Sequence, residues 1–249
     1  MAGDPDLETT VELLVELANS GATIIELGVP FSDPMADGPV IQRASERALQ
    51  RGFTLANVLE TVAKARQRSS VPIVLFSYYN PLLQYGLVKL VRDAKEAGID
   101  GALVTDLTLE ESGEFASALR VNDLDLIFLV APTSTDERLR AIAERASGFI
   151  YAVSRAGITG EQTGVSAVAE NLVSRVRQCS DLPIAVGFGI STAEQVEKTW
   201  AYADAAVVGS ALVAEIERNA GTSNTVQRVG QLARALVRDD SSPVGSCRF

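Results

Sequence analysis

Two carboxylic acids, Glu26 and Asp37, are the residues of this sequence whose type and placement most directly suggest chemistry. Both lie in the segment ELGVPFSDPMADGP (residues 26–39), which begins where an apolar run ends. Pro30 and Pro34 stiffen this segment, because each proline fixes one backbone dihedral and biases the residue before it toward extended geometry. A stiff loop can hold two acids across a small cavity, which is the physical requirement for paired acid–base catalysis.

Each acid also has a simpler interpretation. Taken alone, Glu26 is typical of a solvated acid at a strand end, and Asp37 is typical of a residue that caps the next helix. Against this, Ile24 and Glu26 share one strand face. In a barrel that face points into the lumen, where partial desolvation lets a carboxyl hold a proton near neutral pH. Asp106 is a third candidate acid, ranked lower because Thr108 offers a cap beside it.

Composition and charge exclude several function classes. The chain of 249 residues has no histidine, which excludes a Ser–His triad and a histidine-ligated metal site. Hydrophobic residues make up 47% of the chain, so one large domain of the barrel or doubly wound kind can form. The formal net charge of −10 repels nucleic acid and anionic membranes, so neither is an expected partner.

Cysteine usage and hydropathy bear on the compartment. Cys179 and Cys247 are the two cysteines, and their number and separation indicate no disulfide framework. We see no signal-peptide pattern and no apolar run long enough to span a bilayer in the sequence. We therefore expect a cytoplasmic protein.

The elements that must position the acids follow from hydrophobic spacing. Short apolar runs predict the strands Thr23–Leu27, Ile73–Ser77, Gly101–Thr105, Asp125–Val130, Phe149–Val153, Ile184–Gly187 and Ala205–Val208. Amphipathic patterns predict the helices Leu7–Ala18, Ile41–Arg51, Thr54–Arg68, Leu87–Ala97, Leu109–Val121, Thr135–Ala146, Val168–Cys179, Thr192–Tyr202, Ala211–Asn219 and Thr225–Val237. Capping-box spacing starting at Ser191 and at Thr108 supports two of these helix starts.

Strands that alternate with helices predict a parallel sheet. Eight such strands would close a (β/α)8 barrel, whose chemistry lies on the loops after the strands. The segment Met1-Ala2-Gly3 is interpreted as the stump of one more strand. The predicted fold class is therefore α/β, a (β/α)8 TIM barrel that lacks most of its first strand. Residues 1–237 are predicted to form this single domain, and residues 238–249 a disordered tail.

The loops after the last strands are rich in glycine. The turns at Gly187–Ser191 and Gly209–Ser210 each open a helix, and such turns bind phosphate through backbone amides. The alternative is that they are tight turns that need glycine for geometry alone. The segment Ser154–Gly164 is interpreted either as a lid over a cavity or as an ordinary surface loop.

The segment at residues 26–39 resembles the signature of the tryptophan synthase alpha chain family. Further motifs of that family occur in the same order, namely YYNP (78–81), VTDL (104–107), SRAGITG (154–160), GFGIS (187–191) and GSA (209–211). The resemblance extends from Ala2 to about Val237. The first segment is long and specific, whereas the glycine turns alone would not identify a family.

The resemblance implies a lyase that cleaves indole-3-glycerol phosphate to indole and glyceraldehyde 3-phosphate without a metal or an organic cofactor. It also implies a partner, the pyridoxal-phosphate-dependent beta subunit, in an alpha2beta2 heterotetramer that passes indole through a tunnel. Two alternatives stay open: a non-catalytic regulatory partner of the beta subunit, and a stand-alone indole-3-glycerol phosphate lyase. Other phosphosugar aldolases are disfavoured by the lack of histidine and of a strand-end lysine.

The resemblance also implies roles for individual residues. Glu26 and Asp37 match the two catalytic acids of the family. The substrate-binding positions correspond to Ile41, Tyr78, Tyr151, Thr159, Gly160, Phe188, Gly189, Gly209 and Ser210. The loops used against the beta subunit correspond to Asp33, Pro34, Asn80 and Pro81.

The chain departs from the family pattern at its N-terminus. The family has a helix and a complete first strand before the segment that matches residues 2–5, and this chain has neither. We expect that Met1 is an internal methionine of a longer natural product, or that the chain is a fragment. An incomplete barrel should be unstable or prone to association, because its strand edges and core seam are open. A smaller departure is Thr108, which stands where the family usually has proline.

Overall fold

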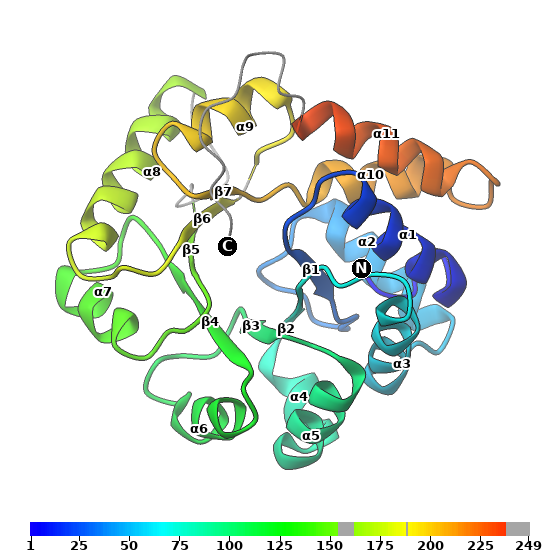
Figure 1. Cartoon of the computed structure of the whole chain (residues 1–249), viewed down its shortest axis with the longest axis horizontal. Helices are drawn as coiled ribbons and strands as arrows, with labels where there is room; N and C mark the ends of the chain where they lie inside the picture. The colour runs from blue at the N-terminus through cyan, green and yellow to red at the C-terminus, as the bar shows by residue number, and fades with distance from the viewer. Residues whose placement is uncertain (154–161, 188, 238–249) are drawn as a thin grey trace.

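Seven parallel strands form one sheet in which each strand pairs with the next along the chain. The computed structural model describes residues 1–153, 162–187 and 189–237. The strands are β1 (Ile25–Gly28), β2 (Ile73–Ser77), β3 (Gly101–Val104), β4 (Asp125–Val130), β5 (Ile150–Val153), β6 (Ile184–Gly187) and β7 (Ala205–Ala206). The sheet curls around a centre and the helices surround it (Figure 1). The predicted α/β barrel class is therefore confirmed; the predicted tail, 238–249, lies outside the described residues.

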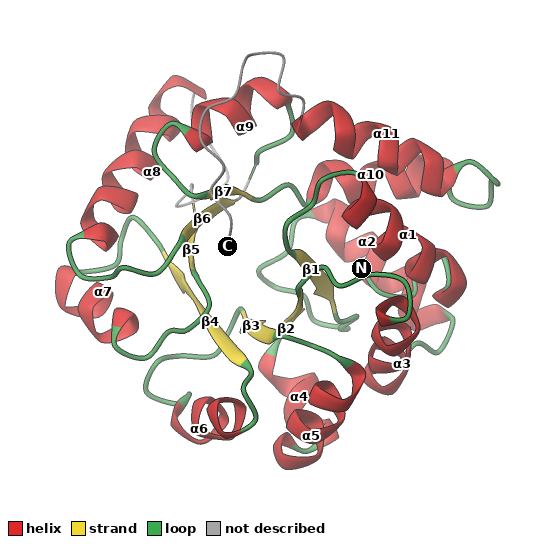
Figure 2. Cartoon of the chain, viewed as in Figure 1, coloured by secondary structure: helices red, strands yellow, loops and turns green. Residues whose placement is uncertain are grey.

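The helices alternate with the strands and cover the outside of the curled sheet (Figure 2). They are α1 (Leu7–Asn19), α2 (Pro39–Gln50), α3 (Leu55–Arg66), α4 (Tyr79–Tyr85), α5 (Leu87–Ala97), α6 (Gly113–Val121), α7 (Asp136–Ala143), α8 (Gln162–Arg177), α9 (Ala193–Trp200), α10 (Ser210–Asn219) and α11 (Thr225–Val237). Ten of these were expected from the sequence, with differences mainly at the ends. Helix α4 was not expected, because it is only seven residues long and contains a proline.

Two predicted helix starts are shifted in the structure. The capping box lies at Thr192 and Gln195, one residue later than expected. The Thr108 hydroxyl does contact the Glu111 carboxylate, at 2.9 Å, but α6 begins only at Gly113. The Thr108 signature therefore closes a turn before the helix rather than the helix itself.

The two faces of the sheet pack into separate hydrophobic clusters. The outer cluster joins strand residues such as Ile25 and Leu27 to the helices. The inner cluster fills the lumen with Val74, Leu103, Ile127, Phe149, Tyr151 and Ala185. Glu26 pairs in register with Val74 of the lumen cluster, while its neighbours Ile25 and Leu27 are buried against helices. The alternation of a strand thus places Glu26 on the lumen face, as the sequence predicted.

In the described part of the chain no ladder joins β7 to β1, so the curled sheet stays open at this seam. The amide of Ala2 donates a hydrogen bond to the carbonyl of Gly28 at 2.9 Å, and Ala2 is completely buried. The first residues therefore lie beside β1, where the strand stump was expected. Helices α1, α2, α10 and α11 lie on this side of the molecule (Figure 1).

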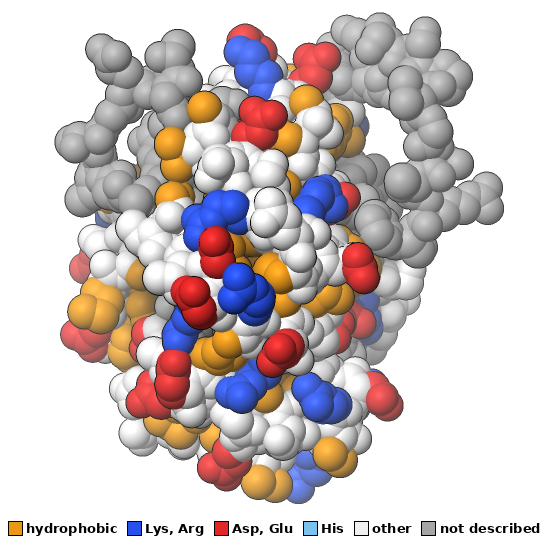
Figure 3. All heavy atoms as spheres, turned by 90° about the vertical axis from the view of Figure 1, so that its left-hand side faces the viewer, with side chains coloured by type: hydrophobic (Ala, Val, Ile, Leu, Met, Phe, Trp, Pro, Cys, Tyr) orange, Lys and Arg blue, Asp and Glu red, His pale blue; other side chains and the backbone are white. Residues whose placement is uncertain are grey.

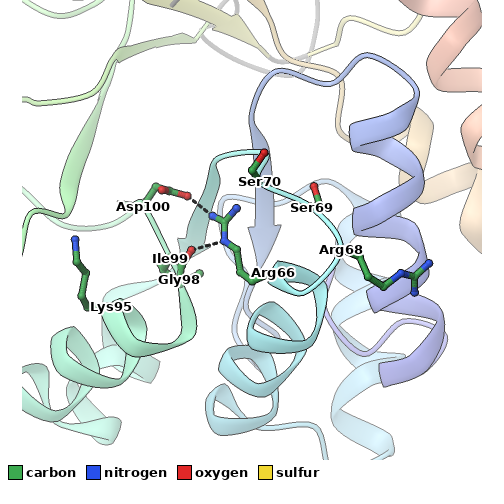
Figure 4. Close-up of a pocket in the computed structure, with 8 residues that line it drawn as sticks. All are labelled: Arg66, Arg68, Ser69, Ser70, Lys95, Gly98, Ile99 and Asp100. Carbon is green, nitrogen blue, oxygen red and sulfur yellow. Dashed lines mark hydrogen bonds and ion pairs between the residues drawn. The ribbon is translucent and has the colours of Figure 1, made fainter.

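Two aspartates accept hydrogen bonds from the N-terminal ends of strands β2 and β6. Asp100 accepts the N–H of Ile73, the first residue of β2, at 2.7 Å, and forms an ion pair with Arg66 at the end of α3. Arg66 also donates to the carbonyl of Gly98 at 2.7 Å (Figure 4). Asp204 repeats this arrangement, because it accepts the N–H of Ile184 at 2.8 Å and an Arg177 hydrogen bond at 2.9 Å. The shallow pocket in Figure 4 is thus built from structural contacts at the strand starts.

The outer surface carries charges of both signs. Figure 3 shows acidic and basic side chains interspersed on the face that includes α7 and α8. One such pair is Arg175 and Asp136, 2.7 Å apart. Exposed pairs of this kind contribute little stability each. Among the described residues, no helix combines the length and the apolarity that crossing a membrane requires.

We expect Asp100→Ala to lower the free energy of unfolding by about 1–3 kcal/mol, because the part-buried N–H of Ile73 loses its acceptor. Asp100→Asn should keep most of the stability, because an amide oxygen can still accept. Urea unfolding measures both. The matched control is Glu12→Ala, which removes only an exposed pair with Arg68 on the same side. An Asp100→Ala loss no larger than that of the control would contradict this role.

Candidate active site

Glu26 is the second residue of β1, and its carboxyl group lies on the lumen face of that strand. Its side chain is part-buried, and desolvation raises its pKa from the usual 4.5 to about 8. Tyr151 on β5 is buried in the same lumen cluster. Burial raises the pKa of Tyr151 well above its usual value, and the Glu26 charge raises it further, so the two groups lie close enough to interact. Glu26 is therefore mostly protonated at neutral pH and can act as an acid.

Gly187 at the end of β6 explains how Tyr151 lies in the lumen. A Cβ atom at position 187 would be only 1.9 Å from the Tyr151 hydroxyl oxygen. The tyrosine therefore crosses directly over the glycine backbone, and no larger residue fits there without a shift. The sequence offered phosphate binding and turn geometry as reasons for this glycine, and the structure adds close side-chain approach.

Asp37 lies on the loop that follows β1. Its amide donates to the Pro34 carbonyl at 3.0 Å, and its own carbonyl accepts a hydrogen bond from the Gln42 side chain at 2.8 Å. Helix α2 has Gly38 as its N-cap and no side-chain cap, so the Asp37 carboxylate is not used as a helix cap. Desolvation raises the pKa of Asp37, and a hydrogen bond from Tyr78 opposes this rise. The carboxylate is thus available for a ligand.

Tyr78 holds the Asp37 loop over the sheet. Its hydroxyl accepts the N–H of Ala36 at 2.9 Å, and its buried ring packs against Phe31 with the ring centres 5.2 Å apart. Burial is the main cause that raises the pKa of Tyr78 to about 12, so its hydroxyl stays neutral. The expected wall residue is therefore also the group that fixes Asp37.

Phe31 and Ser45 help to fix the Asp37 loop, a role that the sequence did not predict. The N–H of Phe31 donates to the Ser45 hydroxyl at 2.7 Å, and that hydroxyl donates back to the Phe31 carbonyl at 2.9 Å. Ser45 is almost fully buried on α2. A serine on the otherwise apolar inner face of a predicted helix was the available signal for this contact.

Asp106, the third candidate acid, makes a backbone contact in the structure. Its carboxylate accepts the N–H of Tyr79, the first residue of α4, at 2.7 Å. It therefore caps α4 from the neighbouring β3 loop. The sequence pattern around α4 could not reveal this helix, because its cap comes from a segment far along the chain.

The glycine turns follow two adjacent strands, since β6 pairs with β7. Gly189 has a φ of +92°, which favours glycine. The N-terminus of α9 is closed by the side chains of Thr192 and Gln195. By contrast, Gly209 precedes α10 as its N-cap without a side-chain cap, and none of the described residues lies within 4 Å of the position its Cβ would take. The N-terminus of α10, with Ser210 as its first residue, is thus better suited to bind an anion than the N-terminus of α9.

The remaining predicted positions differ in what the structure shows of them. Ile41 is part-buried near the start of α2. Thr159, Gly160 and Phe188 lie outside the described residues, as does most of the expected lid. Asp33 and Pro34 lie on the Asp37 loop beside Met35, whose side chain is 88% exposed. Asn80 and Pro81 lie on α4 beside the exposed Leu83. No group of side chains in the described part of the chain could hold a metal ion.

Comparison with known proteins identifies the family of this arrangement. The chain matches the family model described as tryptophan synthase alpha chain over residues 1–239. The tryptophan synthase alpha chain of Solibacter usitatus is 50% identical over 237 residues, which cover 95% of this chain and 89% of the relative. That of Geobacter sulfurreducens is 52% identical over 217 residues, which cover 87% and 82%.

Solved structures agree with the sequence match. A structure of the tryptophan synthase α2β2 complex of Pyrococcus furiosus contains a chain that superimposes with a TM-score of 0.87 at 39% identity, covering 95% of this chain and 94% of that one. Tryptophan synthase of Mycobacterium tuberculosis gives a TM-score of 0.86 at 38% identity, covering 94% and 88%. The lumen acid, the proline-stiffened loop and these matches together show that the chain belongs to the tryptophan synthase alpha chain family.

Proposed function

We propose that Glu26 and Asp37 are the acid–base pair with which this chain performs the lyase reaction of its family. That reaction is the retro-aldol cleavage of indole-3-glycerol phosphate to indole and glyceraldehyde 3-phosphate, in tryptophan biosynthesis. The observation that carries the proposal is the carboxyl of Glu26, kept protonated by burial on the lumen face of β1. We further propose that residues 1–237 are the single domain responsible.

The chemistry requires an acid that can also serve as a base. The carbon–carbon bond cannot break while the indole ring is aromatic at the attachment carbon, so that carbon must first gain a proton. Glu26 delivers this proton, while the Asp37 carboxylate accepts the ring N–H and stabilises the developing positive charge. The Glu26 carboxylate then takes the proton of the adjacent side-chain hydroxyl. The bonding electrons return to the ring, an aldehyde forms, and Glu26 is protonated again.

A pKa of about 8 suits this double role. At pH 7, below this pKa, the protonated form of Glu26 that the first step needs is favoured. After that transfer the carboxylate is a stronger base than an ordinary glutamate, because its charge is poorly solvated. Asp37 remains the acceptor for the ring N–H, since its hydrogen bond with Tyr78 supports the ionised form.

The substrate phosphate is proposed to bind at the uncapped start of α10. The backbone N–H groups after Gly209 and the hydroxyl of Ser210 supply donors there, and the helix dipole favours an anion. A phosphate can therefore bind despite the net charge of −10 on the whole chain.

A beta subunit is the proposed partner, because relatives with this fold are part of tryptophan synthase complexes. The proposed contact surface comprises the Asp33–Pro34 loop and the Asn80–Pro81 turn of α4, with Met35 and Leu83 as its exposed apolar groups. Indole would pass from the lumen to this partner in an α2β2 assembly. The proposed compartment is the cytoplasm, which suits the sparse cysteines of the sequence.

We expect Glu26→Gln to lower kcat for indole release by the isolated chain by roughly two to four orders of magnitude, because the amide cannot donate or accept the transferred proton. Release of indole from indole-3-glycerol phosphate, followed by absorbance, measures this. The matched control is Glu60→Gln, the same change at an exposed site on α3. Equal turnover by the Glu26→Gln variant and the control would reject the assignment.

We also expect the free energies of unfolding of the wild type and of Glu26→Gln to differ increasingly as the pH rises. In the unfolded chain Glu26 ionises near pH 4.5, whereas in the barrel it stays protonated to about pH 8. Between these values each rising pH unit favours unfolding by at most about 1.4 kcal/mol, because only the unfolded state has released this proton. The stability of Glu26→Gln relative to wild type should therefore rise over that range. Urea unfolding at several pH values measures it, and a constant difference would contradict the burial of the acid.

A further inference from the structure

A network of charged side chains joins helices α2 and α10. The Nε and Nη2 atoms of Arg43 each donate a hydrogen bond of 2.7 Å to the Glu217 carboxylate. Arg47, one turn further along α2, contacts Glu217 at 2.6 Å. Arg47 also holds the buried Asp4 through two hydrogen bonds of 2.8 and 2.7 Å. Glu217 is thus the single carboxylate in this network that reaches two arginines of α2 from α10.

The two helices carry opposite ends of the proposed site. Helix α2 begins just after Asp37, the residue proposed above to accept the indole N–H of the substrate. Helix α10 begins at the Gly209–Ser210 turn, which is the proposed phosphate seat. Because a helix is stiff, a contact that fixes one helix against the other also fixes the spacing between their N-termini. The spacing between Asp37 and the phosphate turn therefore depends on this contact.

The position of Glu217 has no explanation within its own helix. It lies in the last turn of α10, where the helix dipole disfavours a negative charge. The arginines of α2 reverse this preference, and the Arg43 hydrogen bond is the main cause that lowers the pKa of Glu217 to about 2. The side chains of Glu217 and Arg47 are only 27% and 28% exposed, so the contact is less screened than an ordinary surface pair.

We propose that Glu217 is a positioning residue for the lyase reaction, because it sets the distance between the phosphate turn of α10 and Asp37 through Arg43 and Arg47. This inference rests on the function proposed above. Indole-3-glycerol phosphate must reach both ends at once, whereas inorganic phosphate needs only the α10 turn. Loss of Glu217 should therefore weaken the binding of indole-3-glycerol phosphate far more than the binding of inorganic phosphate.

The test compares Glu217→Ala with Glu215→Ala in the full chain. Glu215 lies on the same helix, but its ion pair is with Arg218 of α10 itself, so it does not link the helices. We expect Glu217→Ala to lower kcat/KM on the order of 10-fold, because small misplacements of substrate groups reduce rates strongly. The dissociation constant of inorganic phosphate, measured by calorimetry, should change less than twofold. Glu215→Ala should leave both quantities near the wild-type values.

A second variant keeps the proposal testable if Glu217→Ala folds poorly. Arg43→Ala removes the more exposed of the two arginines that contact Glu217. It should also lower kcat/KM, and the double variant should lose less than the sum of the two single effects. Equal losses of phosphate and substrate affinity would overturn the proposal, because they would indicate damage to the turn. Unchanged kcat/KM in both variants would overturn it too.

Failure of the proposed function gives a different result. In a Glu26→Gln background, substrate binding can be measured without turnover. If that variant retains full turnover, the catalytic assignment of Glu26 fails, yet kcat/KM and phosphate affinity of Glu217→Ala, each compared with wild type, still report on Glu217. If Glu26→Gln is inactive and Glu217→Ala binds the substrate as tightly as wild type, only the positioning role fails.

Discussion

Desolvation of one carboxyl group is the constraint on which the site depends. Glu26 points into a lumen lined by apolar side chains, and burial alone raises its pKa to about 8. A cation beside it would return that pKa toward its usual value and leave only a carboxylate. The chain instead places Glu26 beside Val74 in register and close to Tyr151, on the face where the apolar lumen cluster lies. The stability lost by burying an acid is the cost of an acid that can donate a proton at neutral pH.

The second acid is positioned by a different device. Asp37 lies on a loop, and loops are mobile unless they are tied to the scaffold. Here the Tyr78 hydroxyl accepts the N–H of Ala36. The Ser45 hydroxyl bonds both the N–H and the carbonyl of Phe31. The loop is thus fixed to the start of α4 through Tyr78 and to α2 through Ser45, while the Asp37 side chain stays only part-buried. The same loop also presents Met35 outward, so the proposed partner surface begins beside the proposed catalytic acid Asp37.

Most of the fold could be predicted because its signals are local. Alternation along β1 placed Glu26 inward, and amphipathic spacing located ten of the helices in the described part of the chain. Predictions failed where a distant segment decides the outcome. Helix α4 has too short a pattern to be recognised, and its first N–H is capped by Asp106 from another loop. The Thr108 signature has the spacing of a helix start, but the chain turns once more before α6 begins.

The sequence by itself determined the order of the elements, the barrel class, the absence of imidazole chemistry and the family resemblance. These follow from residue types and periodicities that neighbouring residues set. Only the tertiary structure decided the raised pKa of Glu26, the release of Asp37 from a capping role, the second role of Tyr78 and the link from Arg47 to Glu217. Each of these depends on distances between segments far apart in the chain, and such distances exist only once the strands have curled around a common lumen.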